Sequence, residues 1–265
     1  MCVSEWVAEH GLAGVRTRVK PSTFDSYERN LRLHVLPRLG SHTLQQVTPS
    51  LLNRLYADLL TDGHLKQPGG LSAKTVRYIH TIISKALSDA VDTGLIATNV
   101  AERSKPPKPA VRSSTEIRAW TPHQLGRFLA TVRGDRLEAA WRLAAMTGMR
   151  RGEVLGVRWH DLDLETARLS VRQSVVSVAY KITISTPKSH QARVIDLDSV
   201  TCELLHNHHA EQQIERDDMG KDYHDNDLVF SKHDGTHLHP DSFSDAFKRL
   251  RIASQLPRIR LHDLR

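Results

Sequence analysis

The residues best suited to chemistry lie between Thr147 and Leu155, where the chain reads Thr-Gly-Met-Arg-Arg-Gly-Glu-Val-Leu. One glycine precedes Arg150 by two positions, and a second, Gly152, opens the next expected helix. Such a turn presents a guanidinium beside free backbone N–H groups, and the planar fork of arginine suits two oxygens of a phosphate. The pattern predicts an anion-binding turn, and the alternative is a helix–turn–helix corner with solvated arginines.

Two further segments carry chemically useful side chains. Lys188 lies in Thr-Pro-Lys-Ser between two expected strands, where a lysine at a hairpin tip can donate a proton or place its charge on a phosphate. His262 and Arg265 lie three residues apart in Leu-His-Asp-Leu-Arg, so a helix places both on one face, which suits phosphate rather than a metal ion. Taken singly, the two segments also fit a solvated turn and an ordinary amphipathic helix.

The elements that must position these residues differ along the chain. Residues 1–103 are expected to form a small bundle, because apolar residues recur there at three- and four-residue steps. The first expected helix is capped by Ser22 and Thr23. The second starts at Thr48-Pro49 and stops at Gly63, and the third starts at Ser72 and stops at Gly94. The second of these helices is expected to bury Leu51, Leu52, Leu55, Tyr56, Leu59 and Leu60.

Residues 104–115 are expected to form a linker, since Ser104 to Pro109 hold three prolines in four positions and favour an extended chain. Residues 116–265 are expected to form a second domain. Its predicted elements are helices from Thr121-Pro122 and through Trp141 to Thr147-Gly148, a small antiparallel sheet over 167–198, and helices over 200–214 and 240–252. Strands and helices do not alternate as a doubly wound sheet requires, so the fold class is mainly α with a small antiparallel β-sheet.

The charge of the 265-residue chain is unevenly distributed. Its formal net charge is +7, and 39% hydrophobic with 25% charged residues is an ordinary globular balance. Residues 1–115 hold 15 Lys and Arg against 9 Asp and Glu, whereas residues 116–265 hold 22 against 21. The positive excess in the first segment favours a polyanionic partner such as nucleic acid.

The composition also excludes several classes of protein. Two distant cysteines, Cys2 and Cys202, cannot supply a disulfide framework or a cysteine-based zinc finger. No apolar run approaches the ~20 residues that a membrane-spanning helix needs, and the N-terminus lacks a secretory pattern. We therefore expect a cytoplasmic protein with no membrane partner.

The order of the three motifs resembles the tyrosine recombinase (phage integrase) family. It consists of an arginine in a Thr-Gly-x-Arg-x-Gly-Glu turn, a hairpin lysine, and His-x-x-Arg. The resemblance covers nearly the whole chain and includes the stretch Pro37 to Gly40, the proline-containing linker and the segment Val157 to Asp163. It implies a helical core-binding (SAM-like) domain and an α+β catalytic domain, which hold duplex DNA between them as a C-shaped clamp.

The resemblance also implies a role for each site residue. Arg150 and Arg265 grip the non-bridging oxygens of the scissile phosphate and stabilise the pentacoordinate transition state. Lys188 protonates the leaving 5′-hydroxyl, and His262 assists proton transfer and holds the phosphate. Glu153 supports the arginine turn. A tyrosine forms a 3′-phosphotyrosyl link that conserves the bond energy, so neither a metal nor a nucleotide cofactor is required.

The position of the nucleophile departs from the family pattern. In the family the nucleophilic tyrosine follows His-x-x-Arg, whereas this sequence ends at Arg265. The five tyrosines all precede the motif: Tyr27, Tyr56, Tyr78, Tyr180 and Tyr223. We expect a C-terminally truncated recombinase that binds DNA without cleaving it, and a homotetramer on DNA for the full-length enzyme. The alternatives are a non-catalytic DNA-binding or regulatory protein and a type IB topoisomerase, against which the core-binding segment argues.

Several basic residues are candidates for phosphate or groove contacts. They are Arg29, Arg32, Lys74, Arg77, Lys85, Lys105 and Lys108, and the pair on the polar face of the third helix, Lys74 and Arg77, ranks first. Sixteen histidines raise the question of a metal site. Those that lie close together are His206, His208 and His209, and His233, His237 and His239. Because they lack cysteine partners and a His-Glu-x-x-His pattern, we expect solvated histidines and assign no metal.

Overall fold

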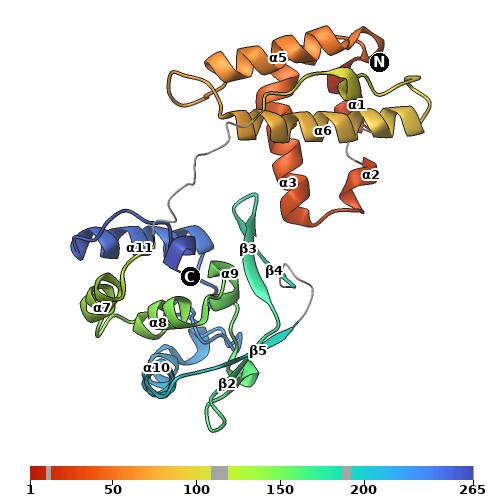
Figure 1. Ribbon diagram of the computed structural model, residues 1–265. Helices are drawn as coiled ribbons and strands as arrows, with labels where there is room; N and C mark the ends of the chain where they lie inside the picture. The colour runs from red at the N-terminus through yellow and green to blue at the C-terminus, as the bar shows by residue number, and fades with distance from the viewer. Residues whose placement is uncertain (10–12, 109–118, 187–191, 265) are drawn as a thin grey trace. The chain divides into compact units, whose positions relative to one another are not determined.

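The computed structural model describes residues 1–9, 13–108, 119–186 and 192–264. It divides the chain into two compact units, Met1–Thr115 (unit 1) and Glu116–Arg265 (unit 2), each with its own hydrophobic core (Figure 1). Among the described residues, no helix is both long and apolar enough to cross a membrane.

Unit 1 is built from helices. Its α-helices are α1 (Val3–Glu9), α2 (Ala13–Arg16), α3 (Pro21–Asn30), α4 (Leu36–Leu39), α5 (Pro49–Asp62) and α6 (Ala73–Asp92). A π-helical turn, Leu31–Val35, joins α3 to α4, and 3-10 turns cover Leu44–Gln46 and Val100–Arg103. The two longest helices, α5 and α6, pack against each other (Figure 1).

The start signals of α5 and α6 are confirmed. Thr48 Oγ1 accepts the Leu51 N–H at 3.2 Å, and Ser72 Oγ accepts the Thr75 N–H at 3.1 Å. These bonds satisfy backbone donors that the first helical turn leaves without a partner. The predicted caps of the first helix, Ser22 and Thr23, are wrong. The helix in question, α3, begins at Pro21, with Lys20 at its N-cap position and ahead of both predicted caps. The fixed φ of proline suits the first helical position, where the missing N–H needs no partner.

The core of unit 1 follows the predicted apolar stripes with one exception. Leu52, Leu55 and Leu59 of α5 are buried as expected, but Leu60 is 40% exposed. At 3.6 residues per turn, Leu60 falls about 80° from Leu52 at the edge of the stripe, so its side chain reaches solvent. The longer helix α6 buries one or two residues in nearly every turn: Val76, Ile79, Ile82, Ile83, Ala86, Leu87 and Ala90.

The start of the predicted linker packs on unit 1. Ser104 is buried and donates its hydroxyl to the Ala101 carbonyl at 2.7 Å. The Lys105 N–H donates to Asn53 Oδ1 at 2.6 Å. The remainder of the predicted linker, beyond residue 108, lies outside the described residues.

Unit 2 combines helices with short strands. Its helices are α7 (Pro122–Thr131), α8 (Glu138–Thr147), α9 (Arg151–Val154), α10 (Ser199–Met219), α11 (Pro240–Ala253) and the 3-10 helix η6 (Leu261–Leu264). Its strands are β1 (Leu162–Asp163), β2 (Arg168–Val171), β3 (Ser174–Val178), β4 (Lys181–Ser185) and β5 (Arg193–Asp196). The predicted helix starts are confirmed, as at Thr121, whose hydroxyl accepts the Gln124 N–H at 3.2 Å.

The strands form two sheets where the sequence predicted one. Strands β1, β2 and β5 make an antiparallel sheet in that order, whereas β3 and β4 form a separate hairpin. The hairpin turn is Ala179 and Tyr180, which have φ values of 47° and 63° and match a tight two-residue turn. The described strands before and after Lys188 pair with different partners, β4 with β3 and β5 with β2. The predicted hairpin tip at Lys188 lies outside the described residues.

An aromatic cluster forms the centre of the unit 2 core. The Trp141 ring of α8 stacks on the Phe243 ring of α11 with centroids 4.1 Å apart. Phe128 of α7 and Phe247 of α11 complete the cluster, and their ring centroids lie 5.5 Å apart. This packing fixes α8, and so it fixes the chain reversal that follows Thr147.

Candidate functional site

A tight reversal separates α8 from α9. Gly148 adopts a left-handed conformation with φ 63° and ψ 20°, which residues with a side chain rarely adopt. The Thr147 hydroxyl donates to the Leu143 carbonyl at 2.6 Å and accepts the Met149 N–H at 3.3 Å. Met149 is buried, so the reversal is anchored in the core and delivers Arg150 to the N-cap of α9.

The second glycine of the motif brings α9 close to β3. A Cβ on Gly152 would lie 2.4 Å from the Val175 carbonyl oxygen and 2.5 Å from Ser174 Oγ. Gly156 lies near the same strand, and Gln173 Nε2 donates to its carbonyl at 3.0 Å. The expectation that Gly152 belongs to a new helix is confirmed, and the reason is steric: this short helix leaves no room for a side chain there.

Glu153 lies at the centre of the site, with only 1% of its surface exposed. Its Oε2 accepts the Arg150 backbone N–H at 2.9 Å, and its Oε1 accepts Arg150 Nη1 at 2.9 Å. Arg193 of β5 donates Nη2 to Oε2 at 2.7 Å and Nη1 to Oε1 at 3.3 Å. One buried carboxylate therefore holds two guanidinium groups from different elements of unit 2.

The electrostatics of this arrangement keep Glu153 ionised. Burial raises the pKa of Glu153, but the hydrogen bonds from Arg193 and Arg150 outweigh burial and lower the pKa from 4.5 to about 2. The cluster of one carboxylate and two guanidiniums therefore carries a net charge of +1. A group of that charge with partly exposed guanidiniums is suited to an anion.

Arg150 and the neighbouring Arg151 have different environments. The Arg150 side chain is 41% exposed and spends one of its five N–H donors on Glu153, among the bonds of the described residues. Arg151 instead donates Nη1 to Ser244 Oγ at 2.7 Å and to Asp241 Oδ1 at 3.2 Å, which ties α9 to α11. The alternative of two merely solvated arginines does not describe this turn.

The other site residues predicted from the sequence are placed only in part. His262 is exposed on η6, which packs against α11 and buries Leu264 in the core. Arg260 fixes the start of this turn by donating Nη2 to Asp263 Oδ1 at 2.6 Å. Lys188 and Arg265 lie outside the described residues.

Sequence reasoning missed Arg193. A signal was present, because Arg193 alternates along β5 with the exposed residues Val194 and Asp196 and shares the more buried face with Ile195. A cation on the inward face of a strand needs a carboxylate partner. Nothing in the local sequence identifies Glu153, forty positions earlier, as that partner.

The described histidines do not gather into a metal site. Among the residues that the structure describes, no group of three or more His, Cys, Asp or Glu side chains could hold a metal ion. The expectation of solvated histidines is wrong for His208, which is buried in α10 with Nε2 2.7 Å from the Val229 carbonyl oxygen. Burial lowers the pKa of His208, so this ring is neutral and structural.

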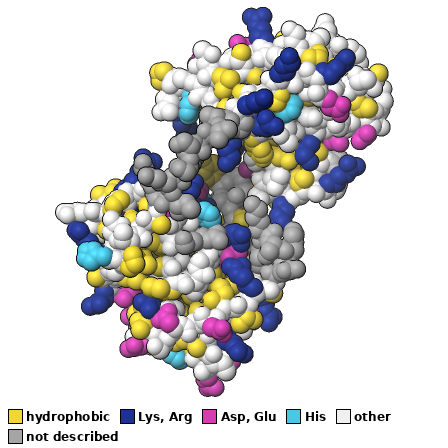
Figure 2. All heavy atoms as spheres, viewed as in Figure 1, with side chains coloured by type: hydrophobic (Ala, Val, Ile, Leu, Met, Phe, Trp, Pro, Cys, Tyr) yellow, Lys and Arg dark blue, Asp and Glu magenta, His cyan; other side chains and the backbone are white. Residues whose placement is uncertain are grey.

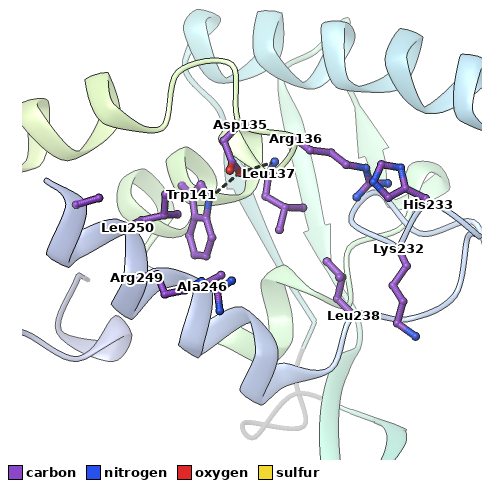
Figure 3. Close-up of a pocket in the computed structure, with 11 residues that line it drawn as sticks. Asp135, Arg136, Leu137, Trp141, Lys232, His233, Leu238, Ala246, Arg249 and Leu250 are labelled. Carbon is purple, nitrogen blue, oxygen red and sulfur yellow. Dashed lines mark hydrogen bonds between the residues drawn. The ribbon is translucent and has the colours of Figure 1, made fainter.

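A separate groove of about 610 Å³ opens in unit 2 (Figure 3). Three parts of unit 2 form its walls. They are α11, which contributes Arg249, the segment that carries Lys232 and Leu238, and the start of α8. The Asp135 carboxylate, which lines the groove, accepts the Leu137 N–H at 2.9 Å and Trp141 Nε1–H at 3.3 Å. The described residues that line this groove include none of the site residues predicted from the sequence.

A row of cations lies on unit 1. Lys74, Arg77 and Lys85 are exposed on α6, and their spacing places them within one stripe of the helix. Their side chains make no hydrogen bond or ion pair with another residue in the described part of the chain. The other predicted contacts, Arg29, Arg32, Lys105 and Lys108, are also exposed. Figure 2 shows Lys and Arg side chains spread over the visible face of unit 1.

A helical, cation-rich unit followed by an α+β unit with an arginine turn defines a recognisable class. Residues 118–265 match the Phage integrase family, and residues 3–60 match the phage integrase N-terminal SAM-like domain. Because the first match spans more than half of the chain, the protein belongs to the phage integrase family.

Particular relatives agree with this class. The XerC-like tyrosine recombinase of Caldanaerobacter subterraneus subsp. tengcongensis is 26% identical over 269 residues, with 95% of this chain and 67% of the relative covered. The ICEBs1 integrase of Bacillus subtilis is 26% identical over 257 residues, with 96% and 67% covered. The chain thus spans about two thirds of the length of these relatives.

Solved structures share the fold. The Tn1549 transposon integrase in complex with a circular intermediate DNA has a TM-score of 0.76 at 20% identity, over 100% of this chain and 84% of that chain. A lambda integrase tetramer bound to a Holliday junction has a TM-score of 0.68 at 17% identity, over 100% and 68%. The fold class predicted from the sequence, mainly α with a small antiparallel β component, is confirmed.

Proposed function

We propose that the protein acts as a tyrosine-type site-specific DNA recombinase, which cuts and rejoins duplex DNA through a 3′-phosphotyrosyl intermediate. The observation that carries the proposal is the Arg150 turn. In this turn a buried, ionised carboxylate at the start of a helix holds a partly exposed guanidinium. The chain that carries the turn belongs to the phage integrase family. Such a guanidinium stabilises the extra charge of a phosphoryl transition state.

In this proposal each site residue has one task. Arg150 and Arg265 hold the non-bridging oxygens of the scissile phosphate, and Glu153 holds the arginine turn in place. Lys188 protonates the leaving 5′-hydroxyl, and His262 assists proton transfer. Side-chain donors supply all of this chemistry, so the proposal assigns no cofactor or metal.

Unit 1 contributes the duplex contacts in this proposal. The exposed cations of α6, with Arg29 and Arg32, contact phosphates, and Lys105 and Lys108 extend the contacts along the backbone. Solved relatives support DNA as the partner, since the Tn1549 and lambda integrases were determined with DNA. The lambda integrase tetramer on a Holliday junction supports a homotetramer as the working assembly of the whole protein.

The proposal gives the role of nucleophile to none of the five tyrosines of this chain. Tyr27, Tyr56 and Tyr78 belong to unit 1, and Tyr223 stacks against Arg216. Tyr180 is 86% exposed at the tip of the β3–β4 hairpin. Among described residues, no hydrogen bond links any of these five to Arg150, Glu153 or Arg193. The chain is therefore expected to bind DNA without forming a covalent link.

A trapping experiment tests both parts of the proposal. The 265-residue chain is incubated with a library of nicked duplexes that trap covalent intermediates, and bound DNA is separated on native and on denaturing gels. We expect a complex on the native gel that weakens with salt, and no adduct on the denaturing gel. Absence of binding at low salt would overturn the DNA-binding part, and an adduct would place the nucleophile among the five tyrosines.

The product of the reading frame that encodes these 265 residues distinguishes a recombinase from a DNA-binding protein without catalysis. We expect that protein to form the denaturant-resistant adduct on the trapped duplexes and to lose it when Arg150 is replaced by Ala. The matched control is Arg168→Ala, which removes an exposed arginine of unit 2 that pairs with the exposed Asp196. A DNA complex without any adduct would instead support the non-catalytic alternative.

A further inference from the structure

The two guanidiniums that share Glu153 are bound differently. Arg193 reaches both carboxylate oxygens, at 2.7 and 3.3 Å, whereas the Arg150 side chain reaches only Oε1, at 2.9 Å. A two-point contact between guanidinium and carboxylate is the stronger arrangement. Of the two guanidiniums, that of Arg193 therefore holds Glu153 more firmly, while Arg150 adds its backbone N–H to Oε2 at 2.9 Å.

We propose that Arg193 is a positioning residue. It pairs with the Glu153 carboxylate, so that the guanidinium of Arg150 stays available to a phosphate of DNA. This inference rests on the proposed function. An isolated Arg150–Glu153 pair would be neutral, and its arginine would gain by turning a second N–H toward the carboxylate. With Arg193 present, the cluster of Glu153 and the two arginines keeps a net positive charge, and most side-chain donors of Arg150 make no bond to another described residue.

The origin of Arg193 in the fold suits this task. It stands opposite Val171 in the β2–β5 ladder, so its backbone is held by a sheet and not by the Arg150 turn. Its side chain is 36% exposed, whereas Glu153 is 1% exposed, so the carboxylate has no access to water as an alternative partner. If Arg193 is removed, Arg150 is the one described residue whose side chain still donates to the buried Glu153 carboxylate.

The test measures phosphate binding at Arg150 itself. In the full chain labelled with nitrogen-15 arginine, the Arg150 side-chain Nε–H resonance is identified by its loss in Arg150→Lys and followed during titration with inorganic phosphate. In the unaltered chain we expect a saturable shift. In Arg193→Gln we expect about tenfold weaker phosphate binding, because Glu153 then competes for Arg150.

Two rescue variants distinguish positioning from a merely structural role. Arg193→Lys retains the positive charge and is expected to restore most of the lost affinity. The double variant Glu153→Gln with Arg193→Gln removes both the competing charge and its partner, so its phosphate affinity is expected to return to near that of the unaltered chain. Arg168→Gln, an exposed arginine of the same sheet, is the matched control and is expected to change nothing.

The outcomes separate this inference from the proposed function. If Arg150 of the unaltered chain does not respond to phosphate, the proposed phosphate site fails and the inference falls with it. If Arg150 responds and Arg193→Gln binds phosphate equally well, the inference alone is overturned. It is also overturned if the double variant stays as weak as Arg193→Gln, because the loss then owes nothing to the charge of Glu153.

Discussion

The two units of the molecule use positive charge in opposite ways. In unit 1, cations such as Lys74, Arg77 and Lys85 are exposed on a helix, without an ion-pair partner among the described residues. In unit 2, arginines are held by carboxylates. Examples are Arg136 with Glu215, Arg142 with Asp198, Arg150 and Arg193 with Glu153, and Arg260 with Asp263.

This difference explains why net charge alone is a poor guide to the site. Unpaired exposed cations give salt-dependent contacts along a polyanion, and their mobility matters little. A cation that must meet one phosphate has to be held in place, and the carboxylates that hold it cancel its contribution to the net charge. The nearly neutral unit is therefore the one suited to chemistry.

The largest expected effect comes from removing the carboxylate that holds the arginine turn. Glu153→Ala leaves two guanidiniums without their buried partner and is expected to destabilise unit 2 by about 3 kcal/mol. Urea unfolding followed by tryptophan fluorescence measures this, because Trp120, Trp141 and Trp159 report on unit 2 and Trp6 on unit 1.

The matched control for Glu153→Ala is Asp196→Ala. Asp196 is an exposed carboxylate that pairs with Arg168 at 3.5 Å, so its removal is expected to cost less than about 0.5 kcal/mol. Equal losses for the two variants would contradict the view that burial makes the Glu153 cluster special.

Acid should affect the two units unequally. Burial raises and arginine contacts lower the pKa of Glu153, to about 2 from an ordinary 4.5, so its stabilisation is complete above pH 4.5 and is lost as the pH falls toward 2. Linkage allows at most about 3 kcal/mol, and the partly exposed arginines reduce this to about 2 kcal/mol. Asp263, with a pKa lowered to about 2 chiefly by its bond from Arg260, acts in the same direction.

Urea unfolding at pH 5 and pH 3 measures this difference. The midpoint reported by the unit 2 tryptophans is expected to fall more than the midpoint reported by Trp6. In unit 1, burial raises the pKa of Asp89, so protonation of this group does not weaken the fold in that range. A parallel fall in both units, or an unchanged pH dependence in Glu153→Gln, would show that the cluster is not the acid-sensitive element.

A smaller loss is expected from filling the space between α9 and β3. The added methyl of Gly152→Ala meets backbone and side-chain atoms of β3, so we expect a loss of about 1–2 kcal/mol. Gly126→Ala is the matched control, since a Cβ there meets no atom within 4 Å and α7 should gain about 0.5–1 kcal/mol. Thermal unfolding of the two variants measures these changes in stability. If Gly152→Ala leaves the stability unchanged, α9 can move away from β3.

The smallest expected effects concern single cations of unit 1. Lys74→Gln, Arg77→Gln or Lys85→Gln should each weaken binding to any duplex a few fold and lower the slope of log K against log salt by about 0.9. Lys66→Gln, an exposed lysine outside α6, is the control. Fluorescence anisotropy at several salt concentrations checks this, and an unchanged slope would remove that residue from the interface.

Local rules predicted the parts of the fold that depend on neighbouring residues. The hydroxyl caps at Thr48, Ser72 and Thr121 satisfy donors three positions away, so the sequence contains all the information they require. The same holds for Gly148, whose left-handed turn ends α8 as expected.

Contacts between distant residues were not predictable in this way. Strand β2 pairs with β5 rather than with the nearer β3, so one expected sheet became two. The same pairing delivers Arg193 to Glu153, and the burial of His208 depends on Val229 from another segment. Of the four catalytic residues named from the sequence, Arg150 and His262 lie in described elements, and the tasks assigned to all four stay predictions.

The most direct test of the account asks whether Arg150 meets DNA. The full chain labelled with nitrogen-15 arginine is titrated with a duplex of about 20 base pairs, and anisotropy of the same DNA reports total binding. The account predicts that the Arg150 side-chain resonance shifts in step with the bound fraction while that of Arg168 does not. DNA binding that leaves the Arg150 resonance unmoved would contradict it.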